Sequence, residues 1–377
     1  MNIEIRNAFA NIPRAAWDAL VGDGSAFLEW AWLASLEEAG CVGSQTGWQP
    51  HHLTLWDGPH LVGACPVYVK DHSQGEFVFD HAWAEAARRS GIRYYPKLLV
   101  GVPFTPATGT RFLTHPDSDR SRLVRIMAKA LMDVCRQTGT SSAHVNFCLP
   151  DEAATLGAIG FTPRTGYQFH WTNPGWRTFD DYLAAFRSKR RGQIKRERQE
   201  LAAQGVEITV DVGTDIPDIL FGPMFQLYSS TIDKLYWGRQ YLNLHFFELL
   251  RQRWKHRLCF ILARRGGNII AGTFNVRKNE VLCGRYWGTF EEMRFLHFNV
   301  CYYAAIEYCL REGITRFEPG AGGEFKYLRG FDASPTVSMH FLADARLASG
   351  VRNYLRQERA AVTAELMWLA EHSPIRK

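Results

Sequence analysis

The residues with the clearest chemical potential lie in the segment Phe317–Phe331, which has the sequence FEPGAGGEFKYLRGF. Its three glycines permit positive φ angles and a close approach of the backbone. A charge cluster on a glycine-rich turn at the end of a strand is a common position for a site in α/β proteins. The pattern favours a functional site over a surface turn with solvated charges. The charged residues around the turn are Glu318, Glu324, Lys326 and Arg329.

A second group is a basic run in Phe186–Glu200, FRSKRRGQIKRERQE. As a helix, this run spreads positive charge around most of its circumference, which suits contact with a polyanion such as tRNA or a nucleotide phosphate. A solvated helix and contact with an anionic membrane are the alternatives. No aromatic residue follows Phe186 within the run, so base stacking is not expected there. The basic residues are Arg187, Lys189, Arg190, Arg191, Lys195, Arg196 and Arg198.

A third group lies in the segment 75–83, where Glu76, Asp80 and His81 stand among aromatic residues. Titratable groups beside aromatic rings suggest a pocket for a substrate amine or a sugar. The alternative is a structural strand with one buried salt bridge, to Arg93 or Lys97. The set is too thin to predict a metal site.

Bulk composition narrows the class of protein. The chain of 377 residues has a net charge of +6 and eight cysteines, none in a C-x-x-C pair. Most cysteines lie in apolar segments, which predicts reduced core thiols in a cytoplasmic protein and no zinc site. No apolar run approaches the roughly 20 residues that a membrane span needs. The opening sequence MNIEIRNAF does not resemble a secretory signal.

The elements that must position these groups recur in the two halves of the chain. The segments 52–70 and 260–278 each have an apolar stretch, a Gly-bearing turn and a second apolar stretch, which predicts two hairpins. Each hairpin follows an aromatic-rich helix and precedes a strand, a helix and a further strand. This common order predicts two similar domains. The other matched pairs are 27–36 with 241–250, 98–101 with 281–284 and 126–139 with 300–313.

We place the domain boundary near WTNPGW, residues 171–176, which carries the strongest turn signal near the middle of the chain. The predicted N-terminal domain spans residues 1–172 and carries an insertion at 71–106. The predicted C-terminal domain spans residues 173–377 and carries the basic run and the glycine-rich turn. Within it we expect one long helical region at 223–254 and a C-terminal helix at 344–372.

The glycine-rich turn also carries a family resemblance. Gly-x-x-Phe-Lys-x-x-x-Gly-Phe, in the second of two related domains, resembles the lysine turn of the Fem-like peptidyltransferases, a tandem branch of the GNAT acyltransferases. The segments GEFVFDHAWA, YYPKL, PFTPATG, GRYWG, LHF, CYYAAIEY and FEPGAGGEFK together resemble a Fem-related family labelled peptidoglycan biosynthesis/recognition. The resemblance covers nearly the whole chain. It implies an α/β fold with mixed sheets, made of two tandem GNAT-like domains in the Fem arrangement.

Two departures from these patterns bear on the donor and the lysine. GNAT domains that use coenzyme A have a glycine-rich loop whose N–H groups hold the pyrophosphate. Here the corresponding interval, GTFEEMRFLHFN, has two glutamates and no such loop. This argues against acyl-CoA and for the aminoacyl-tRNA donors of Fem-like enzymes. In addition, four residues separate Lys326 from Phe331, whereas the Fem turn has two.

The resemblance assigns roles to individual residues. Lys326 is the candidate cation for the negative charge that develops in acyl transfer, and Glu318 and Glu324 are the nearest carboxylates that could take the amine proton. The strand that crosses the second domain supplies Arg285, Tyr286 and Trp287, which together with His297 are candidates to line the cleft. Core packing is the alternative for Tyr286, Trp287 and His297.

We therefore expect an N-acyltransferase that moves an aminoacyl group from aminoacyl-tRNA, as co-substrate, to an amine of a peptide or peptidoglycan-precursor-like acceptor, without a bound cofactor. Arg187, Lys189, Arg190, Arg191, Lys195 and Arg196 would contact the donor phosphates. One alternative uses an acyl-CoA or carrier-bound donor. Another is a non-catalytic protein that recognises its ligand with the same fold.

Overall fold

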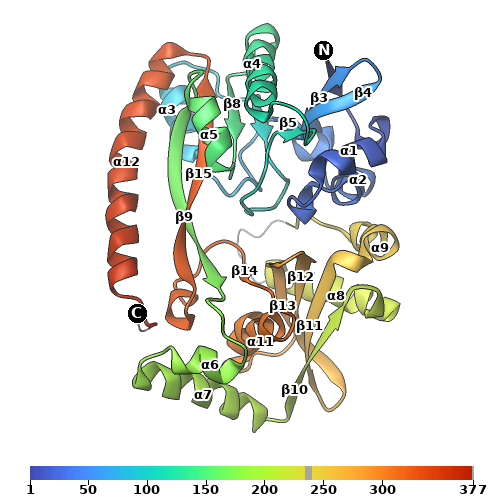
Figure 1. The fold of residues 1–377 in the computed structure, drawn as a ribbon, viewed down its shortest axis with the longest axis vertical. Coiled ribbons are helices and arrows are strands. Elements are labelled where there is room, and N and C mark those ends of the chain that lie inside the picture. The colour runs from blue at the N-terminus through green and yellow to red at the C-terminus, as the bar shows by residue number, and fades with distance from the viewer. Residues whose placement is uncertain (234–239, 376–377) are drawn as a thin grey trace. The chain divides into compact units, whose positions relative to one another are not determined.

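A computed structural model describes residues 1–233 and 240–375 of the chain, and it divides them into two compact units (Figure 1). Unit 1 comprises Met1–Tyr167 and Pro335–Glu365, and unit 2 comprises Gln168–Ser334 and Leu366–Lys377. Both units combine helices with β-sheet, as predicted. None of the helices among the residues described is both long and apolar enough to cross a membrane.

The division differs from the predicted boundary in one main respect. The segment 335–365 belongs to unit 1, whereas we placed it in the C-terminal domain. The reason is strand pairing and packing: Met339 and Leu342 lie opposite Val145 and Ser142 in an antiparallel pair. The helix that follows buries Leu347, Val351 and Leu355 in a cluster with Trp83 and Ala87. Local sequence patterns cannot reveal a pairing of such long range.

Unit 1 contains two sets of paired strands and the helices that cover them. One set has the order β1-β3-β4-β7, and the other has the order β15-β8-β6-β5-β2. The 19-residue helix α4 buries Leu123, Met127 and Leu131 in the core beside them. The elements are β1 (Asn2–Arg6), α1 (Arg14–Val21), α2 (Trp30–Glu38), β2 (Trp48–Pro50), β3 (His52–Asp57), β4 (His60–Cys65), β5 (Val67–Lys70), α3 (His81–Arg89), β6 (Lys97–Val100), β7 (Leu113–Thr114), α4 (Arg120–Thr138), β8 (Ser142–Val145), α5 (Pro150–Gly157), the first part of β9 (Thr162–Thr172), and most of β15 (Asp332–Leu342) and of α12 (Ala345–Glu371).

Unit 2 contains strands in the order β10-β11-β12-β13-β14, and β14 also pairs with the end of β9 at Trp171 and Thr172. Helix α8 packs on β12 and β13. The elements are α6 (Phe179–Ala184), α7 (Ser188–Ala202), β10 (Val206–Val212), α8 (Phe221–Asp233), α9 (Leu244–Arg253), β11 (Leu258–Arg265), β12 (Asn268–Lys278), β13 (Val281–Thr289), α10 (Leu296–Phe298), a π-helical turn (Asn299–Tyr303), α11 (Ala304–Arg311), β14 (Arg316–Glu318) and a 3₁₀ turn (Tyr327–Arg329).

The predicted repeat is confirmed in its strand pairings. Hairpins β3–β4 and β11–β12 are both antiparallel, and each unit then has one parallel pair, β6 with β8 and β13 with β14. The two copies differ at Pro66. Because proline has no N–H to donate to a ladder, the second arm of the first hairpin breaks into β4 and β5, which belong to different sets of strands. The equivalent strand β12 continues unbroken for 11 residues.

Three local predictions need comment. The expected long helix at 223–254 is two helices, α8 and α9, with non-helical residues 240–243 before α9; part of the interval, 234–239, lies outside the residues described. The turn at WTNPGW forms as predicted, since Asn173 Oδ1 accepts hydrogen bonds from the N–H groups of Gly175 and Trp176. All eight cysteines are free thiols, and six of them are buried.

Candidate functional site

The candidate site begins where two strands of unit 2 separate. Parallel pairing of β13 with β14 extends only over Val281–Cys283, opposite Arg316–Glu318. Strand β14 ends there, whereas β13 continues to Thr289. A β-bulge adds Arg285 to β13, because Gly284 lies opposite Asn275 while Tyr286 lies opposite Phe274. The separated strands leave a length of β13 edge facing the glycine-rich turn.

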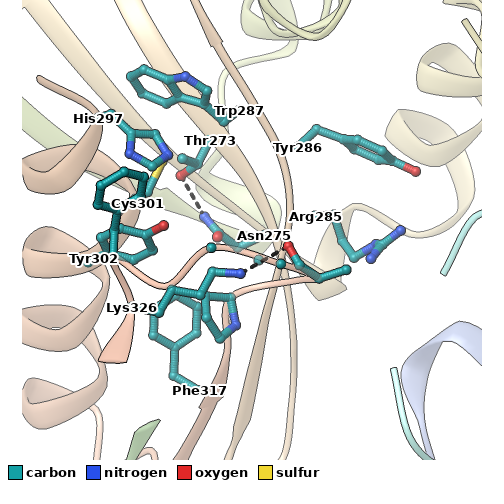
Figure 2. A pocket seen from close by; sticks show the side chains of 16 residues that line it. Thr273, Asn275, Arg285, Tyr286, Trp287, His297, Cys301, Tyr302, Phe317 and Lys326 are labelled. Carbon is teal, nitrogen blue, oxygen red and sulfur yellow. Dashed lines mark hydrogen bonds between the residues drawn. The ribbon is translucent and has the colours of Figure 1, made fainter. Parts of the chain in front are cut away.

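A cavity of about 260 Å³ occupies this region and lies wholly within unit 2 (Figure 2). Aromatic side chains and glycine backbone form much of its wall. The ionisable residues of the wall are arginine, lysine, histidine, tyrosine and cysteine, and no aspartate or glutamate is among them. The lining residues are Thr273, Asn275, Gly284, Arg285, Tyr286, Trp287, His297, Cys301, Tyr302, Phe317, Pro319, Ala321, Gly322, Gly323, Phe325 and Lys326.

Lys326 lies in the wall of this cavity, as the glycine-rich turn predicted. Its side chain is 4% exposed, and its Nζ donates to the carbonyl oxygens of Gly320 at 2.6 Å and Ala321 at 3.1 Å. Those two carbonyls belong to a turn in which Gly320, Gly322 and Gly323 all have positive φ. No carboxylate lies within ion-pair distance of Nζ among the residues described. Burial therefore lowers the pKa of Lys326 to about 8.

The two candidate carboxylates lie in different environments, and neither lines the cavity. Glu318 is 7% exposed at the end of β14, where its Oε1 lies 2.7 Å from an Arg316 nitrogen. Its Oε2 lies 3.9 Å from Nε2 of the buried His170. Glu324 is exposed, and its side chain forms no hydrogen bond or ion pair with the residues described.

The residues predicted from β13 divide between two faces. Trp287 faces the cavity and contacts His297, with 5.2 Å between ring centroids. Burial lowers the pKa of His297 to about 4, so its ring is neutral at pH 7. Tyr286 packs in the core instead, 4.8 Å from the ring of Tyr228. Figure 2 shows the Tyr286 ring turned away from Trp287 and His297. Core packing was thus the correct interpretation for the Tyr286 ring, although Tyr286 also contributes to the cavity wall.

Sequence reasoning missed four polar or soft residues of the wall. Asn275 is 2% exposed and donates through Nδ2 to Thr273 Oγ1 at 2.9 Å and to the Cys259 carbonyl. These two polar residues alternate in an otherwise apolar strand, and that pattern was an available signal. Cys301 and Tyr302 come from the π-helical turn Asn299–Tyr303. Such turns are often found at functional sites, but no residue pattern predicts this one.

The basic run forms helix α7, as predicted. Arg187, Lys189, Lys195 and Arg196 are exposed, and Arg190 and Arg191 are partly exposed. Arg190 donates to Gln193 and Arg191 to the Phe186 carbonyl, while Arg196 lies 3.6 Å from Glu200. Arg187, Lys189 and Lys195 form no hydrogen bond or ion pair in the part of the chain described. The helix also has a buried face, on which Glu197 is 1% exposed.

The acidic candidates of unit 1 form a buried ion-pair cluster. Lys97 Nζ lies 2.8 Å from Glu76 Oε2, 2.9 Å from Ser73 Oγ and in short contact with Asp80 Oδ2. Tyr94 also donates to Asp80 at 2.6 Å. This arrangement is the buried salt bridge to Lys97 that we gave as the alternative. His81 is exposed at the start of α3 and takes no part in the cluster.

The pKa values of these carboxylates move in opposite directions. Burial, only partly offset by the Lys97 ammonium, raises the pKa of Glu76 to about 7. Burial also acts on Asp80, but Lys97 outweighs it and holds the pKa of Asp80 below its usual range. At pH 7 the Lys97 ammonium therefore keeps Asp80 ionised, whereas Glu76 is about half protonated.

Two α/β units that repeat the same strand pairings define a tandem GNAT-like fold. Solved structures agree on the fold. FemX has a TM-score of 0.57 at 10% identity, covering 93% of this chain and 100% of its own. L-PGS from Bacillus licheniformis has a TM-score of 0.56 at 9% identity, covering 92% and 97%. The C-terminal domain of a putative lysylphosphatidylglycerol synthetase from Agrobacterium fabrum has a TM-score of 0.55 at 13% identity, covering 89% and 93%.

The chain belongs to the FemAB-like family, described as peptidoglycan biosynthesis/recognition, whose model matches residues 8–377. No curated protein matches it. The predicted family and the predicted tandem GNAT-like fold are both confirmed. Membership relates the chain to peptidoglycan biosynthesis or recognition.

Proposed function

We propose that the protein transfers an aminoacyl group from aminoacyl-tRNA to an amine of a peptide or peptidoglycan-precursor-like acceptor. The observation that carries the proposal is Lys326, which is buried with no carboxylate partner among residues 1–233 and 240–375, in a cavity that also exposes part of the β13 edge. A cation and backbone N–H groups beside a donor carbonyl are the groups that this reaction needs. Family membership supports the acyl transfer and the peptidoglycan-related acceptor.

In the proposed reaction the acceptor amine attacks the ester carbonyl carbon of the donor. The new C–N bond forms, and negative charge develops on the carbonyl oxygen, where the Lys326 ammonium would stabilise it. Each donor placed against such an oxygen typically contributes about 3 kcal/mol. The C–O bond to the ribose of tRNA then breaks, and the leaving oxygen takes up a proton as the amine loses one.

Glu318 is the better of the two candidate carboxylates for that proton. It lies at the end of β14 and precedes Pro319 of the cavity wall. Its Oε1 lies 2.7 Å from an Arg316 nitrogen. Glu324 is exposed and outside the wall.

The interval after β13 supports tRNA over coenzyme A as donor. Pyrophosphate binding needs several free N–H groups in one loop. Here the N–H of Phe290 donates to the Ile270 carbonyl at 2.8 Å, and the N–H of Glu291 donates to Thr289 Oγ1. Glu291 also brings negative charge, which is balanced by Arg265 at 2.5 Å. Because these N–H groups are already bonded and the loop carries a carboxylate, binding of the coenzyme A pyrophosphate is disfavoured here.

Helix α7 is the proposed contact for the tRNA backbone. Its exposed basic side chains offer charge without base stacking, which suits phosphates of any sequence. The helix packs on the π-helical turn that supplies Cys301 and Tyr302 to the cavity. A backbone held along α7 would therefore lie in the same unit as the proposed acyl site.

Filter retention of a charged bulk-tRNA pool at near-physiological salt, with acetyl-CoA as competitor, tests the donor. We expect retention of aminoacyl-tRNA that acetyl-CoA does not displace. Arg190→Glu/Arg191→Glu/Lys195→Glu should abolish retention without unfolding the protein. The matched control reverses three exposed basic residues of α4, Arg122, Arg125 and Lys129, and should retain tRNA. Absent retention by the natural protein, or equal loss in both triple variants, would overturn the tRNA proposal in favour of a CoA or carrier-bound donor or a binding protein.

A further inference from the structure

A buried arginine, Arg329, forms hydrogen bonds to the backbone of the turn that carries Lys326. Arg329 is 3% exposed, and its Nη1 donates to the carbonyl of Phe325, the residue before Lys326, at 3.0 Å. Its backbone N–H donates to the Lys326 carbonyl at 2.8 Å. The guanidinium also lies over the Phe298 ring, 3.3 Å from the centroid. Arg329 therefore holds the backbone on both sides of the lysine.

The rest of the guanidinium reaches two other elements. Its Nε donates to the Tyr303 hydroxyl at 2.9 Å, and its Nη2 lies 2.8 Å from Glu197 Oε2. Tyr303 comes from the π-helical turn, and Glu197 comes from the middle of helix α7. The Tyr303 hydroxyl makes a further short hydrogen bond to the Glu197 carboxylate. One planar fork thus joins three segments of unit 2.

Glu197 bonds to partners from three segments of unit 2. Its carboxylate accepts from Arg329, from Tyr303 and, through Oε1, from Gln193 Nε2 at 3.0 Å. Its backbone carbonyl accepts from Asn299 Nδ2 at 3.1 Å. Its neighbours Lys195 and Arg196 are exposed. Although its neighbours on the helix are basic and exposed, the Glu197 side chain points inward and bonds within this cluster.

We propose that Glu197, Tyr303 and Arg329 are positioning residues that hold the Lys326 amine in the wall of the acyl cavity and tie its turn to the basic helix. The inference rests on the proposed function, because it concerns the lysine assigned to acyl transfer. None of the three residues lines the cavity. They act on the reaction through Lys326 and through the π-helical turn, whose residues Cys301 and Tyr302 do line it.

A titration of the Lys326 side chain by NMR tests this role without donor or acceptor. The protein is labelled with ¹³Cε-lysine, and the Lys326 signal is identified by its absence in Lys326→Arg. The natural protein should titrate at a midpoint of about 8. In Arg329→Met the midpoint should move toward the ordinary lysine value of 10.5, as the freed turn exposes the amine. Loss of the Arg329 charge also acts to raise the pKa of Lys326, so displacement is read from the variant Glu197→Met/Arg329→Met, in which the net charge of the cluster is unchanged.

Two further variants keep the test decisive if Arg329→Met does not fold. Glu197→Met/Arg329→Met removes both charges together and leaves no unpaired buried ion. Tyr303→Phe removes only the bridging hydroxyl and should give a smaller shift in the same direction. Arg277→Met is the matched control, since Arg277 also contacts a tyrosine and a glutamate, Tyr308 and Glu312, away from the turn. It should leave the midpoint unchanged.

An unchanged Lys326 midpoint in every folded variant of the cluster would overturn the positioning role. An equal shift in Arg277→Met would also overturn it, because the effect would then reflect general loosening of unit 2. Neither result depends on tRNA. Failure of tRNA retention would refute the proposed donor and leave the titration result standing.

Discussion

Two of the buried lysines, Lys97 in unit 1 and Lys326 in unit 2, show how differently the same residue can be used. Lys97 is 0% exposed and Lys326 is 4% exposed. Lys97 is surrounded by Glu76, Asp80 and Ser73, whereas the amine of Lys326 contacts two backbone carbonyls. Burial alone would lower the pKa of both. The two carboxylates outweigh it and raise the pKa of Lys97, while the pKa of Lys326 falls to about 8.

The difference separates a structural charge from a chemical one. A buried ammonium with matched carboxylates is locked in its charged state and ties segments together. A buried ammonium with only carbonyl partners has a lowered pKa. Groups with shifted pKa values concentrate at functional sites. We expect mutation of the first lysine to lower stability and mutation of the second to lower activity.

The largest expected effect comes from Lys97→Met. Loss of the ammonium leaves Glu76 and Asp80 buried without their cation, which should lower the free energy of unfolding by about 3–5 kcal/mol. Urea denaturation followed by circular dichroism measures it. Lys129→Met, on the exposed face of α4, is the control and should change stability by less than about 0.5 kcal/mol. A loss below about 1 kcal/mol for Lys97→Met would mean that the cluster does not hold the insertion in place.

Lys326→Met should show the opposite profile. The variant should remain folded, because no buried carboxylate loses its partner. Aminoacyl transfer from retained tRNA to a peptide amine should fall about 10²–10³-fold, the usual cost of one donor to a developing oxyanion. The measurement is single-turnover loss of the aminoacyl ester with acceptor present. Full activity in this variant would contradict the catalytic role of Lys326.

The pH profile sharpens the same comparison. Because the pKa of Lys326 lies near 8, its ammonium is largely present at pH 7 and is lost as the pH rises through about 8. The kcat/KM of transfer should therefore decline above about pH 8 in the natural protein. Lys326→Arg, which cannot lose its charge in this range, should show no such decline. A decline of equal midpoint in both proteins would assign it to another group.

Glu76→Gln should have a smaller effect, on stability. The pKa of Glu76 is raised to about 7, so the folded protein binds this proton more tightly than the unfolded chain does. Its stabilising contribution is present below about pH 4.5 and is lost as the pH rises through about 7. The variant should lose this pH dependence and exceed natural stability by on the order of 2 kcal/mol at pH 8. Parallel urea titrations at pH 5 and pH 8 compare the two proteins; a constant difference between them would be inconsistent with the raised pKa.

Glu324→Gln should have the smallest effect of all. The side chain is exposed and outside the cavity wall, so stability should change by less than about 0.5 kcal/mol and transfer should persist. Glu318→Gln in the same assay should slow transfer. The reverse order of the two variants would move the proton-accepting role to Glu324.

Local patterns predicted much of this protein. Alternation of apolar residues located both hairpins, and the glycines of 320–323 predicted the positive φ turn that carries Lys326. The family resemblance made Trp287 and His297 candidates for the site, and both line the cavity. In each case the signal and the structure lie within a few residues of one another.

What local patterns could not resolve depends on long-range or one-residue effects. The bulge at Arg285 reverses the alternation of β13 and turns the Tyr286 ring to the core. The partner of Glu76 and Asp80 depended on tertiary packing, so Arg93 and Lys97 could not be separated beforehand. The partner of Glu197, Arg329, lies 132 residues further along the chain, beyond the reach of any local pattern.

The assignment of residues 335–365 to unit 1 has a consequence for the order of synthesis. His144 on β8 bonds to His340 on β15, 196 residues later in the chain. At a translation rate of about 5–20 residues per second, β8 would wait roughly 10–40 s for its neighbour. The intervening chain encodes most of unit 2, whose own strands β10 to β14 are close in sequence. The second unit should therefore acquire protease resistance on the ribosome first, while the unit that begins the chain stays vulnerable to nicking.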